Sequence, residues 1–305
     1  MTRLSLIVRL AALWALPSLP AAAQHTDFDV NPLVGTWERV SLLRNSLSVQ
    51  PPDAALYLKF NADGYWSMME MPEDRPKVNK PLEQMTKEEL FARFDKVEGG
   101  WGYYIVKRDI VNRIHDEDIS PGREGTQHVR EYVFEDKIMN LAGTGANRSP
   151  QARMRPLPAS PLSDKRLVGT WERTALLLDG KSTPPPAPEI LLLGEDGWFS
   201  QTHLPKGRER IGKPMEEFTK EDFLKAFKNV GAARGTYTVE GNKFTRKHVA
   251  DIDPNLVGSE QVREFSLEGD TLTLRGSEPA GVKVEAKYRR LPPRPILSWS
   301  VSPPK

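Results

Sequence analysis

The heptapeptide Leu-Val-Gly-Thr-Trp-Glu-Arg occupies residues 33–39 and returns unchanged at residues 167–173, a shift of 134 positions. Further along the chain the shift is 133 and stays constant, as in the pair His115 and His248. A period near 130 residues is far longer than that of solenoid repeats. Each copy is therefore expected to be a complete domain with its own core.

The composition is that of an ordinary globular chain. Of the 305 residues, 38% are hydrophobic and 28% are charged, and there is no Cys. Disulfides, Cys-ligated metals and Cys nucleophiles are therefore excluded. Beyond the first few dozen positions no run of about 20 apolar residues occurs, so no membrane-spanning helix is expected in the body of the chain.

Residues 1–23 have the pattern of a secretory signal peptide. Arg3 precedes an apolar stretch, and Ala21 and Ala23 form a small-residue cleavage site before Gln24. A buried N-terminal helix is the alternative. Removal of the leader leaves 41 basic against 41 acidic residues, which takes away the electrostatic basis for nucleic-acid binding. We expect a periplasmic or secreted protein that has no nucleic-acid partner and no transmembrane segment after signal removal.

Within each copy the apolar residues mostly alternate, which is typical of half-buried strands. Asp63-Gly64 and Asp196-Gly197 are hairpin turn signals between two such runs. About eight runs per copy, joined by short turns, indicate an all-β fold of two antiparallel eight-stranded barrels, each able to hold one small ligand.

One amphipathic helix interrupts each barrel, at residues 86–97 and 219–230. Thr86 with Glu89 forms an N-terminal capping pattern. Because flexible segments flank an apolar helix face that carries Phe94 or Phe227, we expect each helix to act as a lid over one barrel end. A helix docked permanently in the barrel, leaving no cavity, is the alternative.

The predicted boundaries follow the repeat. Residues 25–145 are the first barrel, 146–162 a linker rich in Pro, Ser and Gly, 163–292 the second barrel, and 293–305 a Pro-rich tail. We expect each barrel to fold alone and the tail to be dispensable for folding. The oligomeric state is not predicted.

The sequence resembles the bacterial lipocalin-like domain family. The resemblance rests on Gly-Thr-Trp at residues 35–37 and 169–171, the Gly-x-Trp opening of lipocalin-type barrels, and on the segment 235–274. It covers nearly the whole mature chain, twice. It implies a small antiparallel barrel, and it supports the fold more firmly than any activity. It also implies that an Arg of the last strand stacks on the first-strand Trp, here Arg155 on Trp37 and Arg290 on Trp171.

One face of the strand at residues 126–134 carries an Arg between polar and aromatic neighbours. If this face points into the lumen, Arg130 and its equivalent Arg263 are placed to bind a carboxylate. If it points outward, each pairs with a surface acid. The full set of predicted ligand-binding residues adds lumen and helix aromatics and one imidazole: Arg130, Arg263, His128, Tyr132, Phe265, Phe94, Phe227, Trp66 and Phe199.

The sequence favours a binding protein for a small, largely apolar molecule with a carboxylate or carbonyl end. A barrel enzyme, an isomerase, cyclase or hydrolase with His115 or His248 as acid or base, is one alternative. An envelope interaction scaffold is another. Each of these His residues is also consistent with a hydrogen-bonded turn. No metal or other cofactor is expected, because neither a Gly-rich phosphate loop nor a ligand set at defined spacing is present.

Overall fold

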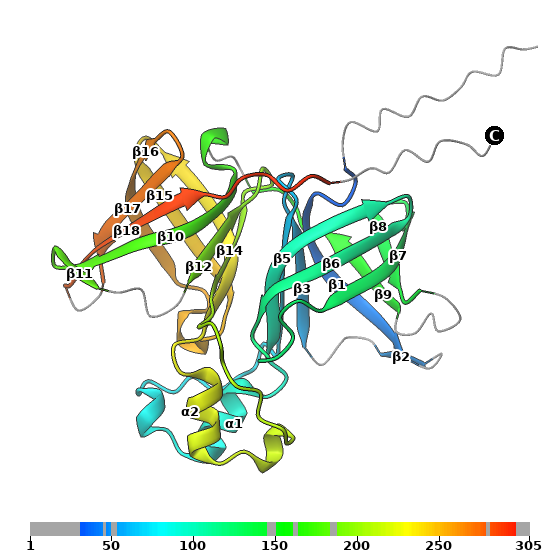
Figure 1. The fold of residues 1–305 in the computed structure, drawn as a ribbon, viewed down its shortest axis with the longest axis horizontal. Coiled ribbons are helices and arrows are strands. Elements are labelled where there is room, and N and C mark those ends of the chain that lie inside the picture. Colours follow the sequence, from blue (N-terminus) through cyan, green and yellow to red (C-terminus); the bar gives the residue numbers. More distant parts are fainter. Residues whose placement is uncertain are drawn as a thin grey trace, which may run out of the picture. The chain divides into compact units, whose positions relative to one another are not determined.

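The computed structural model describes residues 31–44, 47–49, 54–144, 151–160, 164–183, 188–278 and 281–296. The predicted signal peptide lies outside these ranges. Residues 33–305 form one compact unit that contains both copies of the repeat. Figure 1 shows the strands of the two copies.

The first copy is a closed antiparallel barrel. Its strands are β1 (Gly35–Arg44), β3 (Ala55–Phe60), β4 (Tyr65–Met71), β5 (Glu98–Lys107), β6 (Ile110–Asp118), β7 (Gln127–Glu135), β8 (Ile138–Ala142) and β9 (Gln151–Pro156). Neighbours in this order are paired, and β1 pairs with β9 to close the barrel. The short strand β2 (Leu47–Val49) adds to the end of β1.

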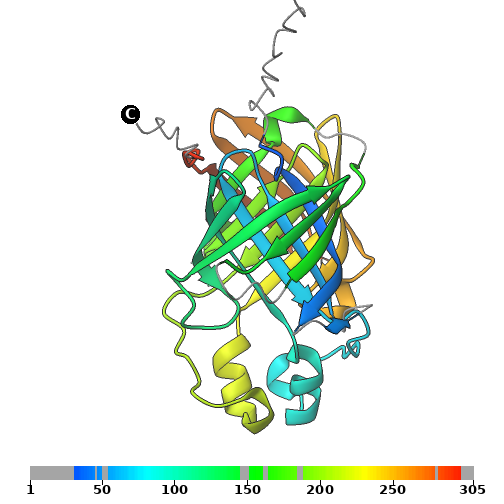
Figure 2. The ribbon, with the colours of Figure 1, turned by 90° about the vertical axis from the view of Figure 1, so that its right-hand side faces the viewer.

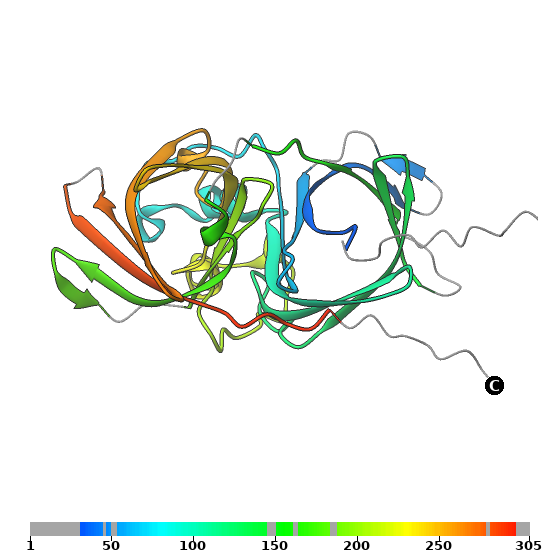
Figure 3. The ribbon, with the colours of Figure 1, turned by 90° about the horizontal axis from the view of Figure 1, so that it is seen from above.

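The second copy repeats this topology. Its strands are β10 (Gly169–Leu178), β12 (Glu189–Leu193), β13 (Trp198–His203), β14 (Gly231–Glu240), β15 (Lys243–Asp251), β16 (Glu260–Glu268), β17 (Thr271–Ser277) and β18 (Lys283–Arg290). β10 closes on β18, and the short β11 (Lys181–Thr183) extends β10. The predicted all-β fold of two eight-stranded antiparallel barrels is confirmed. Figure 3 shows them end-on.

The predicted amphipathic helices are present and shorter than expected. α1 (Lys87–Phe94) lies between β4 and β5, and α2 (Lys220–Phe227) lies between β13 and β14. Both begin with the capping box that the sequence indicates, because the N-cap Thr and the third helical residue bond each other's backbone N–H. The described residues also form four single turns of 3-10 helix: η1 (Leu82–Gln84), η2 (Lys165–Leu167), η3 (Met215–Glu217) and η4 (Pro254–Leu256).

The helices do not cover the barrel ends, so the lid expectation is wrong. Phe94 and Phe227 stack on each other, with ring centroids 4.1 Å apart and planes 5° apart. Figure 2 shows α1 and α2 side by side below the barrels. An amphipathic helix must bury its apolar face, and here each helix helps to bury the face of the other.

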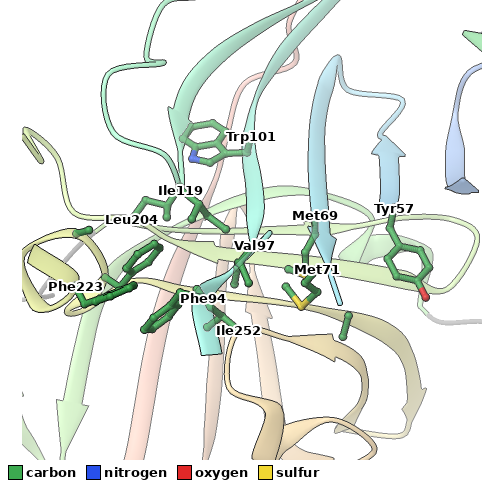
Figure 4. Close-up of a cluster of buried hydrophobic side chains, with 14 of the residues drawn as sticks. Tyr57, Met69, Met71, Phe94, Val97, Trp101, Ile119, Leu204, Phe223 and Ile252 are labelled. Atoms are coloured by element: carbon green, nitrogen blue, oxygen red, sulfur yellow. The ribbon is translucent and has the colours of Figure 1, made fainter. Parts of the chain in front are cut away.

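Three hydrophobic clusters make up the core. One fills the first barrel and includes Trp37, Trp66 and Tyr132. A second fills the second barrel. The third is shared by both copies and contains side chains of β4, β12, α1 and α2; Figure 4 shows part of it.

Strand β4 is buried on both of its faces. Trp66 and Met68 point into the first barrel, whereas Tyr65, Met69 and Met71 belong to the shared cluster. This explains why the strand reads as a nearly continuous apolar run rather than an alternating one.

Some of the polar contacts between the two copies are reciprocal. Arg75 donates to the backbone carbonyls of Asp251 and Ile252. Its repeat equivalent Arg208 donates to the carbonyls of Asp118 and Ile119. Such an exchange of equivalent contacts is the signature of an isologous, two-fold interface.

The segments that follow β9 and β18 also cross to the opposite barrel. The Ser160 N–H donates to the Asp196 carbonyl, and the Arg294 N–H donates to the Asp63 carbonyl, both at 2.8 Å. Ile296 packs against the core of the first barrel. Residues 293–296, the start of the predicted Pro-rich tail, thus contact the first barrel, and residues 297–305 lie outside the described ranges.

The predicted linker also contains part of the first barrel. β9 lies within residues 146–162 and supplies the strand that closes the sheet. The first barrel therefore extends to Pro156, beyond the predicted boundary at 145. The sequence did not indicate this strand, because it has only six residues and lies in a stretch rich in Pro and Ser.

Candidate functional site

The lumen of the first barrel retains a cavity of about 230 Å³. Trp37, near the start of β1, does not line it, whereas Leu42 further along the same strand does. Its apolar walls are Leu42, Leu56, Leu58, Met68, Leu141, Ala152 and Met154. Its charged and polar lining is Arg39, Glu70, Glu98, Arg113, Arg123, His128 and Arg130. The cavity is small, half of its lining residues are apolar, and four of them are arginines.

Two of the four lining arginines are paired with acids. Arg39 lies 2.5 Å from the Glu70 carboxylate and also donates to the carbonyl of Ala54. Arg123 lies 3.3 Å from the Glu98 carboxylate, and both of these side chains are partly exposed. Each of these two guanidinium groups thus has an acid partner without a ligand.

Arg113, on β6, is buried without such an acid. It is 7% exposed, and its guanidinium lies 4.9 Å from the centre of the Trp66 ring. Its only hydrogen-bond contact within the described ranges is to the Met68 sulfur at 3.8 Å, a weak acceptor. Burial and the nearby charge of Arg130 lower the pKa of Arg113 to about 10, so it remains charged at neutral pH.

Arg130, on β7, is the second cation without an acid partner among the described residues. Its side chain donates to the backbone carbonyl of Val129 at 3.0 Å. Burial lowers the pKa of Arg130 below its usual value. Two neighbouring guanidinium groups facing one apolar cavity favour an anion there, because a carboxylate would restore the lost solvation of both.

His128 lies between these arginines and a buried His–Asp pair. Burial and the charge of Arg113 lower the pKa of His128 to about 4, so its imidazole is neutral at pH 7. Its ring centroid is 4.7 Å from that of His115, whose Nδ1 is 2.9 Å from the Asp118 carboxylate. His115 itself does not line the cavity.

In the second barrel, the equivalent cations have hydrogen-bond or ion-pair partners in the protein. Arg246, the counterpart of Arg113, donates to the side-chain oxygens of Gln201 and Gln261. These two glutamines occupy the positions of Met68 and His128 in the first copy. Arg263, the counterpart of Arg130, lies 2.6 Å from the Glu278 carboxylate.

A further ion pair lies inside the second barrel. Arg173 pairs with the buried carboxylate of Glu189, which also accepts a hydrogen bond from the Tyr288 hydroxyl at 2.5 Å. The interior of the second barrel therefore supplies the acceptors that the first barrel lacks.

The predicted site residues fall into three places. Arg130 and His128 line the cavity, and Tyr132 and Trp66 pack in the core of the same barrel. Arg263, Phe265 and Phe199 lie in the second barrel. Phe94 and Phe227 lie in the shared cluster, so the structure does not bring them to either lumen.

Sequence reasoning missed Arg113. Two signals point to it: Arg113 lies two residues before His115 on the same face of a strand, and it has a repeat equivalent in Arg246. The decisive signal is a difference between the copies. Where the second copy has Gln201 and Gln261 as acceptors, the first has Met68 and His128.

The closure of the two barrels differs from the expected pattern. The Arg290 guanidinium lies over the Trp171 indole, 4.1 Å from the ring centre. Arg155 does not lie over Trp37, because the register places Pro156 opposite Trp37 and Arg155 opposite Glu38. A one-residue change of register turns a side chain to the other face of the sheet, and Arg155 pairs there with the Glu38 carboxylate.

Comparison with known proteins agrees with this architecture. Residues 190–300 match the model of the lipocalin-like domain family. The second barrel is therefore similar to the domains of this family. The first barrel repeats the strand order of this lipocalin-like domain, so the protein is a tandem of two lipocalin-like barrels.

Among solved structures, an uncharacterised protein from Bacteroides eggerthii DSM 20697 matches at 15% identity with a TM-score of 0.27, over 41% of this chain and 99% of that one. The comparison with curated proteins gave no match.

No group of three His, Asp or Glu side chains in the described ranges is arranged to hold a metal ion. No helix in the same ranges is long and apolar enough to cross a membrane.

Proposed function

We propose that the first lipocalin-like barrel binds a small, largely apolar molecule through an anionic end, most simply a carboxylate. The observation that carries this proposal is the pair Arg113 and Arg130, which face the cavity without an acid partner in the described part of the chain. The second barrel has a structural role, because its equivalent arginines are bonded to Gln201, Gln261 and Glu278. The signal-peptide pattern of residues 1–23 supports export of this binding protein.

A matched pair of probes tests the charge requirement. Octanoate and 1-octanol have the same chain length and differ in the head group, so isothermal titration separates the contribution of the carboxylate. We expect octanoate to bind and 1-octanol to bind much more weakly. Equal affinity for both would show that the arginines do not select the ligand.

Variants locate the site. Arg130→Met and Arg113→Met should each weaken octanoate roughly 10- to 100-fold, as expected for loss of a charged hydrogen bond. Arg263→Met is the matched control, because Arg263 is the repeat equivalent in the second barrel; it should leave the affinity unchanged. Arg113→Lys keeps the positive charge and should retain part of the affinity. A loss for Arg263→Met as large as that for Arg130→Met would move the site away from the first barrel.

The cavity favours binding over catalysis. None of its lining residues is a Ser, Thr, Tyr or Lys that could act as a nucleophile. An imidazole with a pKa of about 4, as in His128, is a weak general base at neutral pH. His115 is 1% exposed and is separated from the cavity by His128.

A further inference from the structure

The interface between the two barrels combines reciprocal contacts with contacts that occur only once. The bonds of Arg75 and Arg208 to opposite backbone carbonyls are reciprocal, and either copy of the repeat could supply them. Only contacts that occur once can distinguish a pair of unlike copies from a pair of identical copies.

The first such contact is an ion pair whose ammonium group is buried. The Lys59 ammonium of the first copy lies 3.1 Å from the Asp196 carboxylate of the second and 3.2 Å from the Thr36 hydroxyl. The Thr36 hydroxyl in turn donates to Asp196 at 2.6 Å. The Lys59 side chain is 2% exposed, and the equivalent position in the second copy is Leu192.

The second such contact is a buried cation on aromatic rings. The Arg234 guanidinium of the second copy lies 3.8 Å from the centre of the Tyr57 ring of the first copy and 5.4 Å from that of Trp198. Arg234 is 3% exposed and forms no ion pair with a described carboxylate. The equivalents of Arg234 and Tyr57 in the opposite copies are Trp101 and Ile190.

We propose that the inter-barrel face of the second copy is a docking surface specific for a first copy, and that it rejects another second copy. In a pair of second copies, Leu192 takes the place of Lys59 and leaves the Asp196 carboxylate, which is 16% exposed, without its ammonium partner. Ile190 takes the place of Tyr57 and leaves Arg234 buried without its aromatic partner across the interface. Both defects occur twice in a symmetric pair, and an uncompensated buried charge is strongly destabilising.

The test uses the full chain, cleaved after folding. A recognition site for a sequence-specific protease replaces residues 161–163, between Ser160 and Asp164. Native mass spectrometry of the cleaved protein at micromolar concentration should show both fragments in one 1:1 complex. Mixing it with a batch whose second half carries a mass label should exchange the halves and yield no pairs of second halves. Separation of the fragments, or pairs of second halves as abundant as mixed pairs, would overturn the proposal.

Two variants probe the two contacts. Lys59→Leu gives the first copy the residue of the second, and should weaken the 1:1 complex roughly a hundred-fold. Lys137→Leu, an exposed lysine of the same barrel, is the matched control and should have no effect. Arg234→Leu removes the uncompensated cation and should make pairs of second halves detectable. Equal effects of Lys59→Leu and Lys137→Leu would overturn the role of the ion pair even if Arg234→Leu failed to fold.

Discussion

The rings of Phe94 and Phe227 are stacked across the two helices, with centroids 4.1 Å apart. The two residues are equivalent in the repeat, so each helix meets its own counterpart. An apolar helix face that appears from the sequence to be free to cover a ligand is instead covered by its duplicate.

Phe94→Ala is therefore expected to act on stability rather than on ligand binding. The ring is 2% exposed, and its loss should lower the free energy of unfolding by about 3–5 kcal/mol. Denaturant titration measures the loss, and octanoate titration of the folded variant should give an unchanged affinity. A large change in octanoate affinity at unchanged stability would support the original expectation that the helix is a lid.

Arg113→Met and Arg246→Met should change stability in opposite directions. Removal of Arg113 relieves a buried charge without an acid partner and should raise the free energy of unfolding by about 1 kcal/mol. Removal of Arg246 leaves the oxygens of Gln201 and Gln261 without a donor, and should lower it by about 1–3 kcal/mol for each. Thermal unfolding without ligand measures both. Equal destabilisation by the two variants would contradict the contrast between the lumens.

His128 gives the protein a pH dependence with a definite sign. Its pKa is about 4 in the folded state and 6.5 in the reference state. Between these values the unfolded chain binds more protons, so this imidazole lowers the stability as pH falls from 6.5 to 4. Glu117, whose pKa burial raises to about 7, acts in the opposite direction over an overlapping range.

The comparison of wild type with His128→Gln isolates the His128 effect, because the second copy has Gln261 at the equivalent position. The difference in unfolding free energy between the two proteins should change between pH 6.5 and pH 4 and be constant above pH 7.5. A constant difference over the whole range would show that His128 titrates normally.

The two predicted closure arginines should differ in importance. Arg290 lies over Trp171 and donates to the carbonyl of Arg166 at 2.5 Å, so Arg290→Ala should cost about 1–2 kcal/mol. Arg155 forms an exposed pair with Glu38, so Arg155→Ala should cost less than about 1 kcal/mol. Urea unfolding of both variants measures these losses of unfolding free energy. A larger loss for Arg155→Ala than for Arg290→Ala would contradict the observed register.

Export predicts a defined N-terminus. Ala21 and Ala23 satisfy the cleavage rule, so mature protein should begin at Gln24. N-terminal sequencing of protein recovered outside the cytoplasm of the producing cell measures this. Exported material that retained Met1 would contradict the signal-peptide interpretation.

The sequence was sufficient for the barrels and the helix caps, because Thr86 with Glu89 and the alternation of strand residues are local signals. The sequence did not predict which elements the apolar helix faces pack against. Periodicity indicates that the face of α1 is buried and does not say against what, and the answer here comes from the other copy.

The position of Arg155 was missed for a different reason. The shift between the copies is 133 residues over most of their length and 134 in the first and last strands, where Trp37 and Pro156 match Trp171 and Arg290. Matching Arg155 instead of Pro156 with Arg290 is an error of one residue, and it assigns the Arg155 side chain to the wrong face of the sheet. Arg130 and His128 both line the cavity of the first barrel, because alternation within one strand does not depend on that register.

The crossing of the chain after β18 has a mechanical consequence. Because the Arg294 N–H is bonded to the Asp63 carbonyl, a force applied at the C-terminus is transmitted first to the β3–β4 turn of the first barrel, and only then to β18 of the second. The last strand of the chain is therefore shielded from peeling by a domain that precedes it by more than a hundred residues. Tension on the C-terminus should release the crossing segment before it opens the second barrel, so resistance to pulling depends on both copies.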